Sequence, residues 1–263
     1  MNHYSFEDFL EIVARLRGED GCPWDKVQTH ESLREALLEE AYEAVEAIEK
    51  KDTPNLCEEL GDILLQVVFH ADIEKDAGNF DMTHVIDGIC QKMIYRHPHI
   101  FGTAQASTPE EVLEQWERLK KEEKKQKTQT EILKSVPEAL PALMRAKKVQ
   151  KKAADVGFDF PKTEDAMEKV FEECKELWDE IKCNGSGVEE EFGDLLFSLV
   201  NISRFLKINP EFALTNAIKK FINRFEYVEK SALSEEKSLS DMTLEELDLL
   251  WDKSKYHTGP TQQ

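Results

Sequence analysis

The segment LLEEAYEAVEAIEK, residues 37–50, decides the fold class, because its apolar residues recur at the spacing of an α-helix. Five of its fourteen residues are glutamates, and no basic residue precedes Lys50. At about 100° per residue, Glu39, Glu43 and Glu46 face away from the apolar stripe, and Glu40 lies at its border. The stripe expected to be buried consists of Leu33, Leu37, Ala41, Ala44 and Ile48. The segment therefore predicts an amphipathic helix with an acidic outer face.

The same periodicity extends along the rest of the chain. SFEDFLEIVARLRG, residues 5–18, begins with a serine that suits a helix N-cap and ends at a glycine. No segment shows the alternation of apolar and polar residues that half-buried strands require. The sequence thus predicts an all-α protein, with further helices at about 29–51, 54–77, 82–97, 109–126, 138–155, 162–183, 187–207, 210–231 and 243–255.

The second half of the chain repeats the first. VFEECKELWDEI, residues 170–181, matches LLEEAYEAVEAI, and EEEFGDLLFSLV, residues 189–200, matches CEELGDILLQVV, residues 57–68. KKFINRF and LLWDKSK follow in the same order as QKMIYRH and EQWERLK, at nearly constant separation. These ordered matches indicate a tandem duplication of one helical module. We expect an N-terminal module at 1–122, a charged linker at 123–134, a C-terminal module at 135–256 and a disordered tail at 257–263.

Each module has a second helix that is apolar almost all round, which predicts that it is buried. Yet Glu59 and Asp62 share one face of the first such helix, as Glu191 and Asp194 do in the second. Buried carboxylates require protons, basic partners or a metal ion. If the two acidic helices of a module pack antiparallel, four acids meet, and a divalent cation among them relieves their repulsion.

The type of ligand limits the choice of metal. All-oxygen ligation favours Mg²⁺, with Mn²⁺ as a substitute, over zinc or copper. Di-iron helical bundles also hold their metals with carboxylates, but they add Glu-x-x-His motifs. This chain contains no such motif, which disfavours iron. Glycines at 61 and 193, in the same helices as the acid pairs, suit the close approach of another backbone or a ligand.

Basic residues lie at helical spacing in the second module. Lys220 and Arg224 are one turn apart, and Lys169 precedes Glu173 by one turn. Mg²⁺ held by carboxylates beside a lysine and an arginine suits a polyphosphate, and Trp251 is a candidate to stack on a base. The alternatives are ion pairing of Lys220 and Arg224 with surface acids, and packing of Trp251 in the core.

The composition of the whole chain narrows its partners. Acidic residues outnumber basic ones 54 to 34, and the formal charge of −20 disfavours binding to nucleic acid or an anionic membrane. The five cysteines are scattered without a CxxC pair, which argues for reduced thiols rather than disulfides or zinc. The sequence shows neither a signal-peptide core nor an apolar run of membrane-spanning length. We expect a cytoplasmic protein.

An EExxE segment followed by an ExxD segment, twice in one chain, resembles the MazG family of nucleoside triphosphate pyrophosphohydrolases. The resemblance covers most of the chain and includes GCPWDKVQTHESL, LLEEAYEAVEAI, ELGDILLQVVFHA, RHPHIF, RAKKVQKKAADVGFDFP and EEEFGDLLF. It implies an all-α bundle of the dimeric dUTPase-like type, a homodimer and dependence on Mg²⁺. It also implies hydrolysis of nucleoside triphosphates to monophosphates and pyrophosphate, in housekeeping or regulation of the nucleotide pool.

The resemblance also implies roles for individual residues. The metal ligands of the second module would be Glu173, Glu176, Glu191 and Asp194. The nucleotide site would contain Lys169, Glu172, Glu190, Lys220, Arg224 and Trp251. The corresponding acids of the first module, Glu40, Glu43, Glu59 and Asp62, form a second candidate metal site. Family members often have asparagine where this chain has Ile218, so a hydrogen bond to the ligand or the metal shell is missing there.

The chemistry expected of the site is attack of water at the α-phosphorus. Mg²⁺ neutralises the triphosphate and lowers the pKa of a bound water, and Glu172 is our candidate to orient or deprotonate that water. Lys220 and Arg224 then stabilise the charge of the departing pyrophosphate.

The second module is the one that we expect to be catalytic. Lys169 stands one turn before its EExxE acids, whereas the first module has Ala36 at that place. Pro98 ends a helix soon after Arg96, while the helix around Arg224 can continue. The first module is then a weaker site, a site of different specificity or an architectural unit. Two other functions stay open: a non-catalytic helical dimerisation or regulatory scaffold, and a carboxylate-bridged oxidase, which the missing Glu-x-x-His disfavours.

Overall fold

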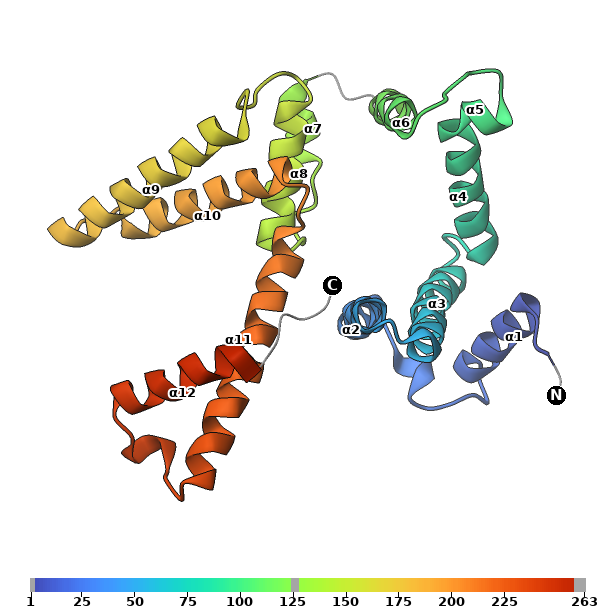
Figure 1. The fold of residues 1–263 in the computed structure, drawn as a ribbon. Helices are drawn as coiled ribbons and strands as arrows, with labels where there is room; N and C mark the ends of the chain where they lie inside the picture. Colours follow the sequence, from blue (N-terminus) through green and yellow to red (C-terminus); the bar gives the residue numbers. More distant parts are fainter. Residues whose placement is uncertain (1–2, 124–127, 258–263) are drawn as a thin grey trace. The chain divides into compact units, whose positions relative to one another are not determined.

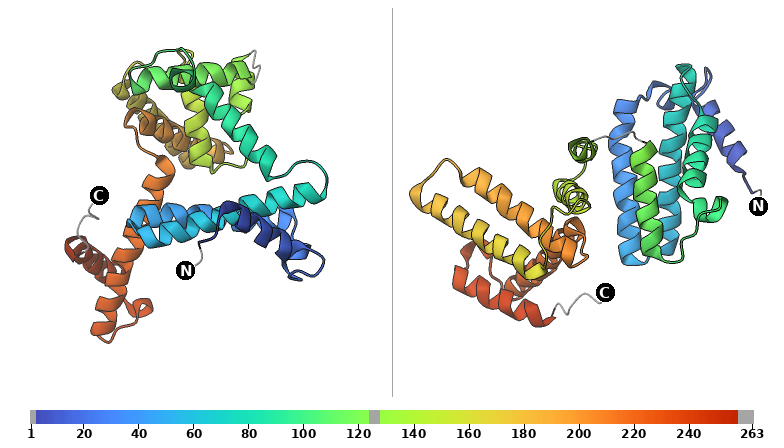
Figure 2. Two further views of the ribbon diagram at one scale, coloured as in Figure 1. Left: turned by 90° about the vertical axis from the view of Figure 1, so that its right-hand side faces the viewer. Right: turned by 90° about the horizontal axis from the view of Figure 1, so that it is seen from above.

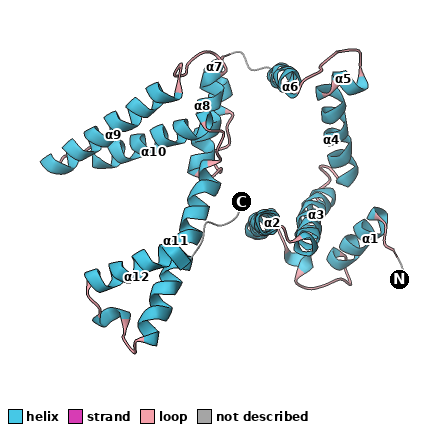
Figure 3. Ribbon diagram, viewed as in Figure 1, coloured by secondary structure: helices cyan, strands magenta, loops and turns pink. Residues whose placement is uncertain are grey.

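The computed structural model describes residues 3–123 and 128–257, and every regular element in these ranges is a helix (Figure 3). The prediction of an all-α protein is confirmed. The chain divides into two compact units, residues 1–124 and 125–263, and the boundary lies within the segment expected as a linker. None of the helices in the described part of the chain combines the length and the apolarity that crossing a bilayer needs.

Unit 1 is built on a pair of long helices joined by a short turn. Its helices are α1 (Phe6–Arg17), α2 (His30–Lys50), α3 (Thr53–Asp76), α4 (Met82–Arg96), α5 (Pro98–Phe101) and α6 (Pro109–Glu123), with a 3₁₀ turn at Asp25–Val27. α2 and α3 lie side by side along their length, and α1 packs on α3 (Figures 1 and 2). Val13, Leu33, Val68 and Phe69 form the buried cluster that joins these three helices.

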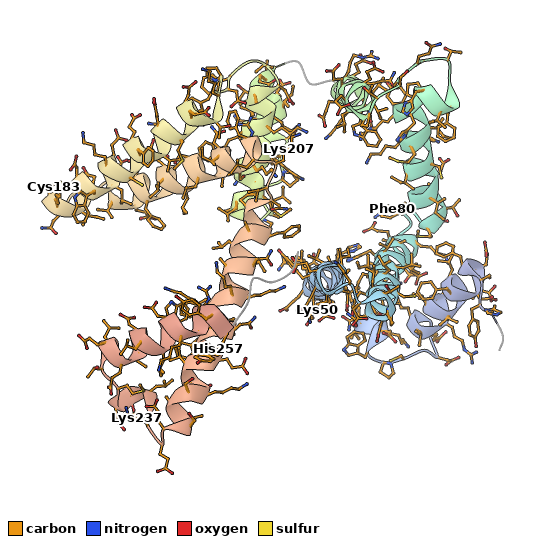
Figure 4. The ribbon with its side chains drawn as sticks, viewed as in Figure 1. Lys50, Phe80, Cys183, Lys207, Lys237 and His257 are labelled. Carbon is orange, nitrogen blue, oxygen red and sulfur yellow. The ribbon has the colours of Figure 1, made fainter. Side chains whose placement is uncertain are left out.

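Unit 2 contains a second pair of the same kind. Its helices are α7 (Gln129–Lys134), α8 (Ala142–Ala154), α9 (Thr163–Cys183), α10 (Val188–Phe205), α11 (Pro210–Ser234) and α12 (Leu244–His257), with a 3₁₀ turn at Leu239–Asp241. α9 packs along α10, α8 packs on α10 and α11, and α11 packs on α12 (Figure 1). Figure 4 marks Cys183 at the turn between α9 and α10, and Lys207 beyond the opposite end of α10.

The segment expected as a linker, 123–134, is partly helical. Its last six residues form α7, which packs on α8 and buries Ile132. The linker is therefore shorter than predicted, because two apolar residues in a charged context are enough to anchor a short helix on its neighbour. The expected tail lies outside the described residues except for His257, which ends α12.

The turns that join the two helix pairs match. Lys51 after α2 and Asn184 after α9 both adopt the left-handed conformation, with φ of 56° and 50°. The helix starts differ, because Thr29 caps α2 and Asp52 caps α3 with their side chains. In unit 2, the residues that precede α9 and α10 are Lys162 and Gly187, and neither provides a side-chain cap.

The apolar helices are buried on one face only. Leu33 and Ala44 of the predicted stripe are buried, but Ala41 and Ile48 are exposed, and Ala47 is buried instead. The prediction that the second helix of each module is buried all round is wrong within each unit. The reason is that each packs against neighbours on one side, while its other apolar face meets none in the described part of its own unit. The exposed residues on α3 and α10 include Leu60, Leu64, Phe192, Leu196 and Phe197.

Candidate functional site

The α9–α10 pair brings three acids of the second module together. Glu173 from α9 and Glu191 and Asp194 from α10 have carboxylate oxygens within 4.8 Å of one another. Glu173 is buried, Glu191 is half-buried and Asp194 is exposed, so the cluster is open to solvent on one side. Burial raises the pKa of Glu191, and the charges of Glu176 and Glu173 raise it further. Glu176 thus lies outside the tight group but adds its charge to it.

Unit 1 assembles the matching cluster from α2 and α3. Glu40, Glu43 and Glu59 have carboxylate oxygens within 4.8 Å of one another, and Glu59 is buried. Burial raises the pKa of Glu40 and of Glu59, and the charge of Asp62 contributes to both shifts. In each unit, three of the four candidate ligands therefore meet, and the fourth lies close enough to act on them electrostatically.

Both clusters follow from the same local pattern. The acids recur three residues apart on each helix, so that they share one face, and the short turn folds that face against its partner. The glycines at 61 and 193 lie in these helices, and a side chain at either would meet no neighbouring element of the described chain within 4 Å. The space needed for the approach of a ligand or another backbone is present.

Lys169 is the cation of the second cluster. Its Nζ lies 2.6 Å from Glu173 Oε1 and 3.0 Å from Glu172 Oε1. Hydrogen bonds to these two carboxylates raise the pKa of Lys169, which favours its charged form. Glu172 is exposed. Ala36 holds the matching place in unit 1 and offers the acids there no cation.

The other basic residues of the candidate site lie apart from the acids. Lys220 and Arg224 are on α11, which packs on α8 and α12. The Arg224 guanidinium carbon lies 5.9 Å from the centre of the Trp251 ring, and its Nε is buried without a hydrogen-bond partner. Trp251 is half-buried and packs on Phe221 in the α11–α12 core. Within one chain, the structure does not bring these three candidates to the acids of α9 and α10.

The matching arginine of unit 1 is neutralised. Arg96 is buried and donates to Glu123 Oε2 through Nε and Nη2, at 2.9 and 2.6 Å. It also lies over Trp116, with its guanidinium carbon 5.4 Å from the ring centre. Within 3–123 and 128–257, no carboxylate forms an ion pair with Arg224. The repeated arginine is therefore available to a ligand in unit 2 and occupied in unit 1.

A cavity of about 670 Å³ adjoins the acids of unit 2. The wall of this cavity includes two acids of the cluster, Glu173 and Asp194, and the lysine that pairs with Glu173, Lys169. The remaining wall comes from α8, the GFDF segment that follows it and α10, with one residue each from α7 and α9, Leu133 and Ala166. The sequence pattern alone does not predict that α8 and the GFDF segment form this wall, although the motif RAKKVQKKAADVGFDFP spans both of them.

Known proteins resemble this chain along almost its full length. The family model of the MazG nucleotide pyrophosphohydrolase domain matches twice, at residues 28–101 and 162–231. A Thermotoga maritima protein named nucleoside triphosphate pyrophosphohydrolase/pyrophosphatase MazG is 45% identical over 250 residues, which are 95% of each chain. The nucleoside triphosphate pyrophosphohydrolase of Escherichia coli K12 is 42% identical over 94% of this chain and 95% of its own. Bacillus subtilis YabN is 48% identical over 96% of this chain and 52% of its own. With both halves matched, the chain belongs to the MazG nucleotide pyrophosphohydrolase family.

Proposed function

We propose that this protein hydrolyses nucleoside triphosphates to nucleoside monophosphates and pyrophosphate in a Mg²⁺-dependent reaction that serves the nucleotide pool. The observation that carries the proposal is the cluster of Glu173, Glu191 and Asp194, whose oxygens lie within 4.8 Å of one another beside Lys169. The relatives from Thermotoga maritima and Escherichia coli, which match along almost their whole length, are named for this activity.

The cluster offers the donors that a hard divalent cation requires. Three carboxylates converge, Glu173 is buried, and the raised pKa of Glu191 shows that negative charge is unfavourable there. Lys169 compensates only part of this charge. Because every donor is an oxygen, Mg²⁺ fits the set and Mn²⁺ is its natural substitute. Glu173, Glu191 and Asp194 would hold the ion, with Glu176 as the fourth ligand.

A residue beside the cluster is proposed to accept the proton of the attacking water. Bound Mg²⁺ would neutralise phosphate charge and lower the pKa of a water molecule. Glu172 is an exposed carboxylate that Lys169 holds at 3.0 Å, and we assign to it the role of general base. It accepts a proton from the water whose oxygen forms the new bond to the α-phosphorus. The bond from that phosphorus to the α–β bridging oxygen breaks, and pyrophosphate leaves.

The phosphate-binding residues are proposed to come from a second copy of the chain in a homodimer. Lys220 and Arg224 cannot reach the acids through the contacts that α11 makes within its own chain. Arg224 retains a buried Nε without a partner, which suits an incoming phosphate oxygen. Glu190, exposed in the first turn of α10, and Trp251 would complete the nucleotide site.

The bare apolar faces of unit 2 support this homodimer. Monomeric proteins rarely expose large apolar surfaces, so several exposed aromatic side chains on packed helices suggest a covering partner. The apolar residues exposed on α9, α10 and α11 include Phe171, Trp178, Phe192, Phe197, Phe221, Ile222 and Phe225.

The second module is proposed as the catalytic one. It has a cation, Lys169, at its acids and an arginine, Arg224, without a carboxylate partner, whereas Arg96 of unit 1 is held by Glu123. The acids of the first module remain a second, weaker metal site in this proposal.

The function is tested by measuring pyrophosphate release from a panel of nucleoside triphosphates with Mg²⁺, with Mn²⁺ and with a chelator. Glu173→Gln and Asp194→Asn should each lower turnover roughly 10²-fold or more, because a metal ion contributes several kcal/mol of charge stabilisation. The matched control is Asp179→Asn, which removes an exposed carboxylate from α9 outside the cluster and should leave turnover unchanged.

Full turnover in both cluster variants would disprove the assigned metal site. The double variant Glu40→Gln with Asp62→Asn should keep most of the pyrophosphate release. If this double variant released no pyrophosphate although the second module is intact, the catalytic site would have to be assigned to unit 1.

A further inference from the structure

The cavity beside the acids of unit 2 has the dimensions of a small-molecule site. Its volume of about 670 Å³ falls within the range of roughly 300–1,000 Å³ that is usual for such sites. Lys169, Glu173 and Asp194 form part of its wall, so a ligand in the cavity would lie next to the carboxylate cluster. A molecule whose charged end binds at the cluster can therefore place an uncharged end in the cavity.

Most of the wall is apolar. Val149 and Ala153 come from α8, Ala166 from α9 and Phe197 from α10, and Phe160 follows α8. Flat, uncharged groups such as heterocyclic rings gain most from such a lining, since the walls replace water on both faces of the ring. A highly charged group would lose its hydration in the apolar part of the cavity and would find compensation only at the charged end of the wall, beside the acids.

Gln150 provides a polar group in this apolar wall. The residue is 5% exposed, and its Nε2 donates a hydrogen bond of 2.8 Å to the backbone oxygen of Phe197. Because a carbonyl oxygen only accepts, this bond fixes which end of the amide is nitrogen. The other end, Oε1, is buried and has no hydrogen-bond partner. A buried acceptor without a donor is unfavourable, and a ligand that brings an N–H group would satisfy it.

Asn201 adds a donor to the same wall. Its Oδ1 accepts a hydrogen bond of 2.9 Å from Arg204 Nη1, which leaves the amide nitrogen to donate. Arg204 also binds both carboxylate oxygens of Asp159, at 3.2 and 2.6 Å, and so holds the GFDF segment against α10. The cavity thus combines an acceptor on Gln150 with a donor on Asn201. Every nucleobase carries an N–H donor and a ring or carbonyl acceptor side by side on its pairing edge.

We propose that this cavity holds the base of the nucleotide, and that Gln150 Oε1 accepts a hydrogen bond from an N–H group of that base. The proposal rests on the proposed function, because the triphosphate of the same molecule would lie at the neighbouring acids. Gln150 then contacts the base, favours nucleotides over triphosphates that have no base, and takes no part in bond breaking.

The experiment compares nucleotides with a substrate that has no base. Steady-state pyrophosphate release is measured for ATP, GTP, CTP and UTP and for ribose 5-triphosphate, in the full-length protein and in Gln150→Met. Methionine keeps about the length and volume of glutamine but removes the acceptor, together with the hydrogen bond that Nε2 donates to Phe197. We expect kcat/KM for the nucleotides to fall about threefold to tenfold, the usual effect of one lost hydrogen bond, mainly through KM. Ribose 5-triphosphate should be hydrolysed equally by both proteins.

The matched control is Gln129→Met. Gln129 also donates its Nε2 to a backbone oxygen, that of Lys152, but it lies on α7 and outside the cavity wall. This variant should leave kcat/KM unchanged for every substrate. An equal loss for nucleotides and for ribose 5-triphosphate in Gln150→Met would show a structural role and overturn the proposal, as would no loss for any nucleotide.

A steric variant keeps the test valid if Gln150→Met is unstable. Ala153→Leu fills the cavity from α8, whereas Ala154→Leu, the control, adds the same volume at a position outside the wall. Binding of the non-hydrolysable α,β-methylene analogue of ATP, measured by calorimetry with Mg²⁺, should weaken at least tenfold only in Ala153→Leu. Equal affinity in the two variants would overturn the proposal. If the wild-type protein binds this analogue but releases no pyrophosphate from any of the four nucleoside triphosphates, the proposed function fails while the base site stands.

Discussion

At the scale of single residues, the second cluster is stabilised by one lysine. Lys169 lies between Glu172 and Glu173, and Glu173 is the buried member of the cluster. The hydrogen bonds of Lys169 compensate the charge that burial would otherwise make unfavourable. A divalent cation at the same acids would supply that compensation in a different way. In the proposed metal site, Lys169 and the metal ion would therefore each stabilise the folded protein by compensating the charge of Glu173.

Replacing Lys169 with methionine should show whether a metal ion can take over the charge compensation that Lys169 provides. In a chelator, Lys169→Met should lower the free energy of unfolding by about 1 kcal/mol, because Lys169 is partly exposed and its ion pair is screened by solvent. Saturating Mg²⁺ should narrow the difference, since the ion neutralises Glu173. Thermal unfolding of the wild-type protein and the variant, in a chelator and in Mg²⁺, measures the loss of stability under each condition. Lys175→Met, an exposed lysine of the same helix, is the control, and an equal loss with and without Mg²⁺ in Lys169→Met would contradict the idea.

At the scale of the elements, the two helix pairs differ in how they begin. Thr29 and Asp52 cap α2 and α3, while Lys162 precedes α9 with an extended backbone but no side-chain acceptor. Its φ of −142° and ψ of 159° already suit an N-cap residue. The first turn of α9 consequently has backbone N–H groups that no cap satisfies, directly upstream of the acids.

The substitution Lys162→Asp should stabilise unit 2. An aspartate at this position can accept a hydrogen bond from the first turn, which contributes roughly 0.5–2 kcal/mol relative to an uncapped start. Lys162→Ala removes the positive charge without adding an acceptor and is the control. The midpoint of thermal unfolding should rise with aspartate and change little with alanine. Equal midpoints for the two variants would show that the start of α9 is satisfied in another way.

The sequence predicted most elements because each helix carries its own signals. Periodic apolar residues and end residues such as Ser5 placed the helices close to their observed bounds. The carboxylate clusters could also be predicted, since acids in an apolar helix need a partner wherever that helix packs. α7 was missed because Ile132 and Leu133 are too few to show a period. The cavity depends on how α8 packs on α10, a tertiary contact to which no local pattern corresponds.

At the scale of the whole molecule, each unit leaves one face of its apolar helices bare. A sequence shows that a face is apolar but not whether the same chain or another one covers it. Trp178 on α9 and Ile222 on α11 are both more than half exposed. In the proposed homodimer these faces are covered, and Arg224 of one copy meets the acids of the other.

Charged residues on these faces should separate the copies. The wild-type protein should have the mass of a dimer by light scattering, whereas Trp178→Glu and Ile222→Glu should shift it towards the monomer. Pyrophosphate release should fall with the dimer fraction, because the acids lose the basic residues of the partner. Val27→Glu alters an exposed valine outside the paired helices and should change neither quantity. A monomeric wild type with full turnover would contradict the homodimer.

The pairing of Arg96 with Glu123 has a consequence for how duplicated proteins diverge. The two halves keep the same acidic pattern, and their matching arginines both lie over a tryptophan. One glutamate at the end of α6 gives Arg96 an internal partner, and this alone makes the arginine unavailable to an anion. If the second module is the catalytic one, as proposed, the two halves would therefore differ in activity although both keep their acids. One carboxylate beside the arginine would then be enough to separate the two modules in function.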